Sequence, residues 1–356
     1  METTKRRSSP VDIWELLKKT SRTFYLSIRI LPREMDEALA LAYLMLRVSD
    51  YLEDSETIPQ DRKARLLHLW ARVLDGEASA REFVRTIDSA GIDGGDGGDD
   101  GSGHRDGNSD RDRDEGSEEV DRYAAVAADE LLSRVSDLPD DLGDAILRHV
   151  RESTAGMERW VRRGPDIATE ADMDDYMHEV AGRVGYLSTE VFAYYSPALQ
   201  QRLGELMPLA RETGLALQTV NVIRGVRDDY ERGWVYIPRS YLRRAGLTPE
   251  ELLDPSRRDD ALAVLELLVQ KAERHLDSAI EYVRRVPRRL RKVRLACIWP
   301  LLFAARTVSL SRGNPRVFSD GVKIARSEIK RIVFWSNLLG SSNLWVSFYT
   351  RKLLRA

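Results

Sequence analysis

Apolar residues recur with the spacing of helix faces along nearly the whole chain, whereas strand-like alternation is nearly absent. Proline and glycine cluster between the apolar runs, as at Gly164-Pro165 and Gly313-Asn314-Pro315, where loops are expected. The pattern therefore predicts an all-α fold, with one domain over residues 1–356 and a cavity between its helices. The longer predicted helices are Arg62–Leu74, Tyr123–Val135, Leu142–Ala155, Asp174–Tyr195, Gln200–Val226, Asp259–Val286 and Arg294–Ser311.

One further predicted helix, Ala38–Asp54, carries charges on an otherwise apolar surface. Tyr43, Arg47, Asp50 and Asp54 follow one another at spacings of four, three and four residues, so they share one face of the helix. A charge pair on a solvated face would not lie among leucine and methionine, and buried charges are costly unless they are paired or bind an ion. Two carboxylates one turn apart that face a cavity can share Mg²⁺, and the metal can in turn hold a diphosphate.

A second polar stripe begins on the helix predicted over Gln200–Val226 and continues beyond it. Gln218, Asn221 and Arg224 recur every three residues, and Asn221 also shares a face with Asp229. One interpretation is a helix end that frays into a loop, with Asp229 solvated. The other is that two carboxylate-bearing helices face each other across the cavity and clamp a metal-bound diphosphate.

A third segment, which begins near Tyr176, has two glycines inside a helical pattern. Gly182 and Gly185 each cost a helix about 1 kcal/mol relative to alanine. We expect the close approach of a ligand or of a neighbouring helix to compensate for them. Tyr176 lies at the entrance of this helix, a position that suits either a core aromatic residue or a catalytic group.

Charge is distributed unevenly along the chain, whose net charge is −3. Residues 91–120 hold eleven acidic residues against three arginines, a net of −8, which leaves +5 for the remainder. This stretch has hardly any apolar residue, so we expect a disordered acidic insertion within the domain. The mildly basic remainder suits an anionic substrate, and we expect no nucleic-acid partner.

The ends of the chain and its cysteine content indicate where it functions. Cys297 is the only cysteine, which excludes an intrachain disulfide and fits a reducing compartment. No apolar segment follows the N-terminus, so we predict a cytoplasmic protein, and we expect a monomer. Residues 330–356 form an amphipathic tail with aromatic residues between basic clusters. The tail would either lie in a membrane interface, as a peripheral contact, or pack on the domain as a final helix.

Four segments occur in an order that points to one protein family. They are SRTFYLSIRILP (Ser21–Pro32), YLMLRVSDYLED (Tyr43–Asp54), DYMHEVAGRVG (Asp175–Gly185) and LQTVNVIRGVRDDYERGWVYIP (Leu217–Pro238). From about Ser21 to Ile329 the chain resembles the squalene/phytoene synthase family, the head-to-head prenyl diphosphate synthases. The resemblance implies an isoprenoid-synthase-type helical bundle with a central cavity.

The resemblance also implies roles for particular side chains. The ligands of Mg²⁺, or of Mn²⁺ in its place, would be Asp50, Glu53, Asp54, Asn221 and Asp229. The residues that contact the substrate would be Ser21, Arg22, Phe24, Tyr43, Arg47, Gln218, Asn221 and Arg224. The catalytic residues would be Arg47, Asp50, Asp54 and Tyr176, of which Tyr176 would transfer protons.

Two positions depart from the family pattern. Gly225 stands where the family has aspartate, and Trp234 stands where it often has arginine. The first change removes a metal ligand, although Asn221 and Asp229 can still hold a cation with water in the gap. The second removes a cation near the diphosphate. Either the metal site is rebuilt or the activity is weakened.

The segment Arg294–Ile329 is similar to the squalene synthase branch of the family, in which a segment such as Val322-Lys323-Ile324 helps to bind NADPH. Lys323 and Arg326 would supply cations for that cofactor, unless the segment is only a basic surface loop. We therefore expect Mg²⁺-dependent condensation of two farnesyl diphosphates to presqualene diphosphate, followed by NADPH-dependent reduction to squalene. The alternatives are dehydrosqualene synthesis without reduction, phytoene synthesis from geranylgeranyl diphosphate, and a non-catalytic helical assembly protein.

Overall fold

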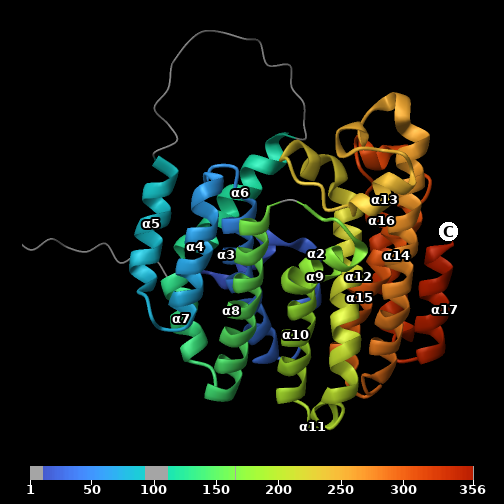
Figure 1. The fold of residues 1–356 in the computed structure, drawn as a ribbon. Helices are drawn as coiled ribbons and strands as arrows, with labels where there is room; N and C mark the ends of the chain where they lie inside the picture. Colours follow the sequence, from blue (N-terminus) through green and yellow to red (C-terminus); the bar gives the residue numbers. More distant parts are fainter. Residues whose placement is uncertain (1–10, 93–110, 165, 356) are drawn as a thin grey trace, which may run out of the picture.

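The computed structural model describes residues 11–92, 111–164 and 166–355, and Figure 1 shows their arrangement. This part of the chain is helical and contains no strand, as the sequence pattern predicts. The helices are α1 (Ile13–Thr20), α2 (Arg22–Arg29), α3 (Met35–Asp54), α4 (Gln60–Leu74), α5 (Ala80–Ile92), α6 (Arg111–Val126), α7 (Ala128–Ser136), α8 (Asp140–Arg163), α9 (Glu170–Met177), a π-helical turn (His178–Gly182), α10 (Arg183–Tyr194), α11 (Pro197–Gln200), α12 (Leu203–Glu231), α13 (Arg239–Arg244), α14 (Arg258–Arg285), α15 (Arg291–Ser311), α16 (Arg326–Leu339) and α17 (Asn343–Leu354).

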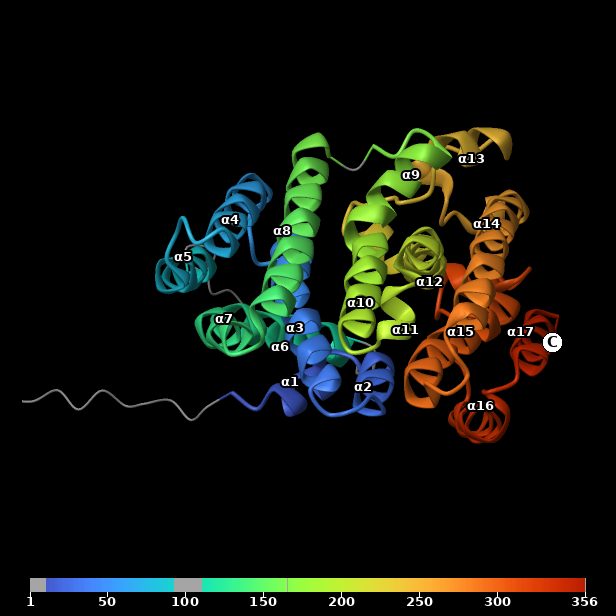
Figure 2. The same ribbon diagram turned by 90° about the horizontal axis from the view of Figure 1, so that it is seen from below.

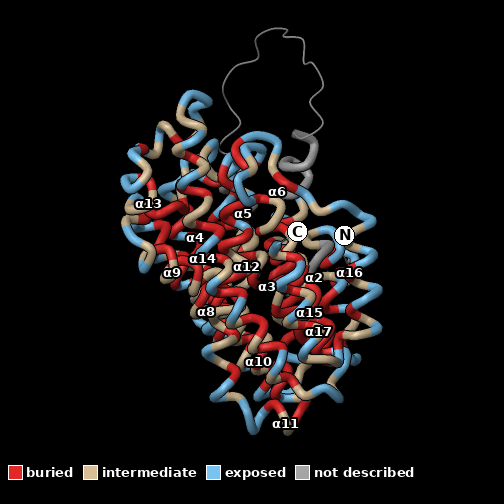
Figure 3. The backbone as a smooth tube through the Cα atoms, turned by 90° about the vertical axis from the view of Figure 1, so that its right-hand side faces the viewer, coloured by how far each residue is buried: buried red, intermediate tan, exposed pale blue. Residues whose placement is uncertain are grey.

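The helices stand side by side around one buried core (Figures 1 and 2). α12 is the central element of the C-terminal part, since it packs on α10, α14 and α15. α8 connects this part to the N-terminal helices, because it packs on α3, α4 and α10. α2 contacts both α3 and α15, and so bridges the two parts. In Figure 3 the buried segments lie in the middle of the molecule and the exposed ones along its edges.

The predicted helices are present, with some of their ends shifted. α8 continues past the predicted end at Ala155 because Trp160 extends its buried stripe. The helix predicted over Tyr123–Val135 is split at Ala127 into the end of α6 and α7. These differences arise where tertiary packing, which local periodicity does not report, decides the length of a helix.

The acidic insertion is shorter at both ends than the sequence predicts. Gly91 and Ile92 complete α5, and residues 111–120 form the first part of α6, so the expectation of disorder is wrong for them. α6 packs along α3, where Ala124 and Ala125 are fully buried. This contact stabilises a helix that its charged composition alone does not indicate. The remaining predicted insertion, residues 93–110, lies outside the described residues.

α3 is buried on almost every side. Leu41, Leu44, Met45 and Val48 have no exposed surface, and α1, α4, α6, α7 and α8 pack around the helix. No proline or glycine interrupts it, and leucine, alanine and methionine favour helix. Because neighbouring helices cover the other faces, the polar face of α3 is directed into the interior of the molecule.

Glycines bring α12 close to α10 and to the π-helical turn at its start. A Cβ at Gly185 would lie 2.2 Å from the carbonyl oxygen of Ala210, and a Cβ at Gly214 would lie 2.3 Å from that of Ala181. The predicted reason for Gly185, the approach of a neighbouring helix, is therefore confirmed. The π-helical turn His178–Gly182 lies at this contact, and such turns are frequent at functional sites.

The predicted tail is part of the folded domain. α16 packs on α15, and α17 packs on α14 and α15. Ile332 of α16 and Val346 of α17 are buried, so the chain ends in two packed helices and not in a free amphipathic segment. Within the described residues, α15 alone has the length and composition of a membrane span, and most of it is buried by the surrounding helices, as is usual for the core helix of a globular domain.

Arg294 of α15 fastens the C-terminal helices although it has no exposed surface. Its Nη1 donates hydrogen bonds to the carbonyl oxygens of Val283 and Val286, at 2.7 and 2.6 Å. Its Nε donates to the carbonyl of Gly340 at 3.2 Å, and its Nη2 donates to Oδ1 of Asn343 at 2.8 Å. One guanidinium thus supplies hydrogen bonds to carbonyl oxygens at the ends of α14 and α16 and to a side-chain oxygen at the start of α17.

We expect the substitution Arg294→Met to lower the free energy of unfolding by about 3 kcal/mol or more, because it leaves several buried acceptors without a donor. Urea denaturation followed by circular dichroism measures this change. The matched control is Arg291→Met on the same helix, since the exposed side chain of Arg291 makes a single hydrogen bond within the described residues, to the carbonyl of Asn337. A loss no larger than that of the control would contradict the structural role of Arg294.

Candidate functional site

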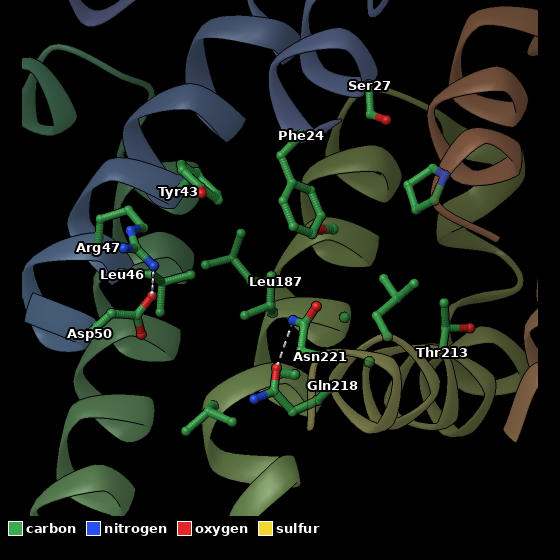
Figure 4. Close-up of a pocket in the computed structure, with 18 of the residues that line it drawn as sticks. Phe24, Ser27, Tyr43, Leu46, Arg47, Asp50, Leu187, Thr213, Gln218 and Asn221 are labelled. Carbon is green, nitrogen blue, oxygen red and sulfur yellow. Dashed lines mark hydrogen bonds and ion pairs between the residues drawn. The ribbon is translucent and has the colours of Figure 1, made fainter. Parts of the chain in front are cut away.

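A cavity of about 420 Å³ lies between α2, α3, α10, α12 and α15. Figure 4 shows Arg47 and Asp50 on the α3 wall, Gln218 and Asn221 on the α12 wall, and Phe24 reaching in from α2. Much of the lining is apolar, and it includes Leu39, Leu46, Val184, Leu187 and Phe192. The cavity therefore combines an apolar body with a polar end.

Carboxylates from two walls meet at the polar end. Asp50, Glu53 and Asp54 come from the C-terminal turns of α3, and Asp229 comes from the C-terminal part of α12. Burial, with a contribution from Asp54, raises the pKa of Asp50 to about 6 and that of Asp229 to about 7. Burial also raises the pKa of Glu53 well above its ordinary value, and its Oε1 is buried without a hydrogen-bond partner. The two carboxylate-bearing helices thus face each other across the cavity, as the sequence suggests.

Two guanidinium groups lie among these carboxylates. Arg47 donates from Nη1 to Oδ2 of Asp50 at 2.8 Å, and from Nε and Nη2 to the carboxylate of Asp121 on α6. Arg232, just after α12, pairs with Asp229. Burial lowers the pKa of each arginine, but the neighbouring carboxylates outweigh it, so both pKa values lie above the ordinary one. Both arginines are therefore charged and already oriented by acidic partners.

Sequence reasoning missed Asp121 and Arg232. Asp121 directly follows an acid-rich stretch, and nothing in the sequence distinguishes it from the acidic residues before it. Its partner Arg47 is 74 residues away, so only the fold brings the two together. Arg232 lies three residues after Asp229, and this spacing was the available signal. Arg232 supplies a cation two residues before Trp234, the position at which the family often has arginine.

Tyr176 lies in an aromatic stack beside the carboxylates. The centre of its ring is 4.7 Å from that of Tyr236, which is 5.6 Å from that of Trp234. Burial, Glu53 and Tyr236 raise the pKa of Tyr176 well above its ordinary value, so its phenol is protonated at neutral pH. Tyr176 and Tyr236 line the cavity, whereas Trp234 supports Tyr236 from behind.

The glycine at position 225 leaves a gap into which Asp229 leans. A Cβ at Gly225 would lie only 3.1 Å from Oδ2 of Asp229. Asn221 does not join Asp229, but donates to Oε1 of Gln218 at 3.1 Å along the same wall (Figure 4). Asp229 pairs with Arg232 instead, and a cation shared by Asn221 and Asp229 stays a prediction.

Some predicted residues do not line the cavity, namely Ser21, Arg224, Lys323 and Arg326. Ser21 caps the first turn of α2. Arg224 is exposed and lies about 120° round the helix from Gln218, so it does not share the cavity-lining face, and its contact with substrate stays a prediction. Lys323 and Arg326 are exposed before and at the start of α16. The side chain of Arg22 lies outside the described residues.

The donor chemistry of the polar end fits a divalent cation. Among the described residues its carboxylates outnumber its two guanidinium groups, so the carboxylates would disfavour an anionic substrate unless cations were present. Carboxylate oxygens are the ligands that Mg²⁺ prefers. Within the described residues, no three acidic, histidine or cysteine side chains are already gathered around one point. This is compatible with Mg²⁺, which usually keeps water and substrate phosphates among its ligands.

Comparisons with known proteins identify the family of the chain. The family model described as squalene/phytoene synthase matches residues 17–328. The squalene synthase of Schizosaccharomyces pombe is 27% identical over 346 residues, which cover 96% of this chain and 68% of the relative. The squalene synthase of Homo sapiens is 26% identical over 321 residues, which cover 90% of this chain and 68% of the relative.

The chain is also similar in fold to solved structures. A complex of TcSQS with a ligand superposes with a TM-score of 0.73 at 27% identity, over 96% of this chain and 90% of that chain. A dehydrosqualene synthase in complex with a ligand has a TM-score of 0.59 at 17% identity, over 96% of this chain and 95% of that chain. The second likeness concerns the fold alone.

The raised pKa of Asp229 leads to a prediction about stability. Its ionised form is less favourable in the folded than in the unfolded protein, so it lowers stability increasingly as pH rises from about 4 towards 7. Without metal, Asp229→Asn should therefore raise the melting temperature by a few degrees above pH 7 and by less near pH 4. Adding Mg²⁺ should stabilise the wild type more than the variant.

Asp228→Asn is the matched control, because Asp228 is adjacent and exposed. Differential scanning fluorimetry at several pH values, with and without Mg²⁺, compares the three proteins. If Asp228→Asn shows the larger gain, or if Mg²⁺ stabilises the wild type and Asp229→Asn equally, then Asp229 is not the buried cation ligand.

Proposed function

The chain belongs to the squalene/phytoene synthase family, and from that premise we propose that it joins two farnesyl diphosphates head to head to presqualene diphosphate and reduces this to squalene. Membership and the relatives named squalene synthase make it a prenyltransferase. The observation that carries the proposal is the cavity, in which carboxylates on two walls end an apolar chamber. Such a chamber suits a substrate with a diphosphate head and a hydrocarbon chain.

The polar end would hold the diphosphate. Asp50, Asp54 and Asp229 would bind Mg²⁺, beside the buried Glu53. When bound, the ion would neutralise the diphosphate and improve it as a leaving group. Arg232 lies among the same carboxylates and adds a charged donor for phosphate oxygens, a role that requires no large movement of the side chain.

The apolar body would hold the two prenyl chains and exclude water. The allylic cation that forms when the first diphosphate leaves would be attacked by the double bond of the second substrate. Water would convert such a cation to an alcohol, so the apolar lining protects it. Phe24 and Tyr43, whose ring centres are 5.6 Å apart in the cavity wall, present aromatic faces that stabilise a nearby cation.

Closure of the cyclopropane ring requires the loss of a proton. Tyr176 borders the cavity, and burial raises the pKa of its phenol well above the ordinary value, so the phenol is protonated at neutral pH and is not itself an ionised base. We therefore assign Tyr176 the role of a relay that accepts this proton while passing its own to the departing diphosphate. The stacked Tyr236 holds the phenol in position for this exchange.

Reduction would require NADPH, and the residues expected to bind it lie outside the cavity. Lys323 and Arg326 are exposed and free to meet phosphate groups. The preceding loop approaches the α12 wall, since a Cβ at Gly321 would lie 4.0 Å from the carbonyl oxygen of Arg224. The cofactor would therefore enter from the side of α12. Without reduction, the same condensation would end at dehydrosqualene or, from geranylgeranyl diphosphate, at phytoene.

Product analysis tests the proposal. With farnesyl diphosphate, Mg²⁺ and NADPH, the wild type should form squalene, and presqualene diphosphate should accumulate when NADPH is omitted. Asp54→Asn should lower turnover by roughly a hundredfold or more, because it removes a charged group at the leaving diphosphate. Glu56→Gln, an exposed position nearby that does not line the cavity, is the control and should retain turnover.

A product that is the same with and without NADPH would identify a non-reducing synthase. Formation of C40 product in preference to C30 product would identify geranylgeranyl diphosphate as the substrate. No condensation product from either diphosphate would contradict the enzymatic proposal.

We also propose that the protein is cytoplasmic and contacts anionic membranes peripherally through α16 and α17, where an apolar product can leave. Five large apolar side chains are exposed on these helices, namely Phe334, Trp335, Leu338, Leu344 and Phe348. Residues 326–356 carry six basic residues and one acidic residue, Glu328. Apolar residues flanked by lysine and arginine are typical of interfacial helices, whereas two such basic surfaces would repel each other in a dimer.

The double substitution Phe334→Ser with Phe348→Ser should lower binding to vesicles that contain phosphatidylglycerol by roughly tenfold or more, since it removes two of the inserting side chains. Co-sedimentation at low and high salt measures it. The control is Tyr123→Ser with Tyr194→Ser, which removes exposed aromatic residues elsewhere. Equal binding of wild type and Phe variant, or a concentration-dependent dimer in place of vesicle binding, would contradict the membrane contact.

A further inference from the structure

The guanidinium of Arg47 is divided between two carboxylates. Its Nε donates to Oδ1 of Asp121 at 3.1 Å, and its Nη2 donates to Oδ2 of the same residue. Only Nη1 reaches Asp50, where it donates to Oδ2 at 2.8 Å. The fork of the arginine, which matches a carboxylate in bidentate geometry, is thus engaged by Asp121 and not by Asp50.

Asp121 acts on this arginine from behind the cavity wall. Arg47 and Asp50 line the cavity, but Asp121 does not. Asp121 is 7% exposed and belongs to α6, which packs on α3 and has the fully buried residues Ala124 and Ala125 one turn further on. The position of this carboxylate is therefore fixed by helix packing and not by the cavity contents.

The division leaves one oxygen of Asp50 available. Among the described residues Oδ1 of Asp50 accepts no hydrogen bond, and Figure 4 shows the single contact between Nη1 of Arg47 and the other oxygen. Arg47 and Asp50 are three residues apart on one helix, a spacing at which an unrestrained arginine can turn its fork onto the carboxylate. Both oxygens of Asp50 would then be occupied.

We propose that Asp121 is a positioning residue that holds the fork of Arg47 away from Asp50 and so preserves a carboxylate oxygen of Asp50 for a divalent cation. This inference rests on the cation site of the proposed function and assigns it a supporting residue on another helix. Asp121 also offsets the charge of Arg47, so that the arginine does not repel the cation bound beside it. Outer partners of this kind commonly contribute tenfold to a hundredfold in metal affinity.

The test measures the binding of Mn²⁺ alone, from the free-ion signal in electron paramagnetic resonance, without substrate. Asp121→Asn should weaken binding by about tenfold or more, because the arginine then turns onto Asp50. The double variant Arg47→Gln with Asp121→Asn should recover wild-type affinity or better, since no fork remains to occupy Asp50. A role of Asp121 in folding alone would not be rescued by removing a second native contact.

Glu119→Gln is the matched control, because Glu119 is exposed on the same helix and its loss changes the net charge equally. Wild-type affinity in Asp121→Asn, a weak double variant, or an equal loss in the control would each overturn the proposal. If Asp121→Asn does not fold, Arg47→Lys is compared with Arg47→Lys plus Asp121→Asn. An ammonium has no fork, so these two should bind Mn²⁺ equally, and a tenfold difference would overturn the proposal.

Failure of the cation site and failure of the role of Asp121 give different results. A wild type that does not bind Mn²⁺ would contradict the cation site itself. A wild type that binds Mn²⁺ and forms the condensed product, together with an Asp121→Asn variant of equal affinity, would contradict only the role of Asp121.

Discussion

The free-energy cost of burying carboxylates at the end of an apolar cavity governs this structure. Asp50, Glu53 and Asp229 have raised pKa values because the surrounding helices withdraw them from water. The positions of these groups follow from the packing of α3, which leaves its polar face no direction other than the cavity. A scaffold of the same shape would be more stable with apolar residues there. Their presence therefore indicates a ligand that supplies positive charge, and it weighs against a purely structural role for the protein.

The two walls of the cavity are fixed by contacts that do not touch a substrate. Close backbone approach at Gly185 and Gly214 sets the distance between α10 and α12. Lys271 of α14, which has no exposed surface, pairs with Glu170 and Asp174 on α9. Since Tyr176 is on the same short helix as these two acids, the ion pairs with the buried lysine also hold the phenol against the aromatic stack. The positions of the reactive side chains thus depend on rigid helices, which are held in place by contacts outside the cavity.

The sequence was informative where one helix carried the whole pattern. The face of α3 with Arg47, Asp50 and Asp54 could be read from spacing alone, because neighbours on a helix are fixed by its geometry. Arg224 does not line the cavity, because a spacing of three residues falls short of the helical repeat by about 60° at each step, so the stripe of polar residues turns away from the cavity. Asp121 could not be identified at all, since its partner lies on another helix. Local periodicity thus predicts faces of helices, while contacts between helices depend on packing that one sequence does not reveal.

The two departures from the family pattern are better understood together than one at a time. Because Gly225 has no side chain, Oδ2 of Asp229 can lie close to position 225 while Oδ1 accepts a hydrogen bond from Arg232. Any side chain at position 225 would press on the Asp229 carboxylate and disturb that pair. Arg232 in turn provides a cation in the cavity lining, while Trp234 stacks on Tyr236 outside it. The glycine, the aspartate and the arginine are therefore interdependent, and the polar end of the cavity is rearranged and not merely depleted of a ligand.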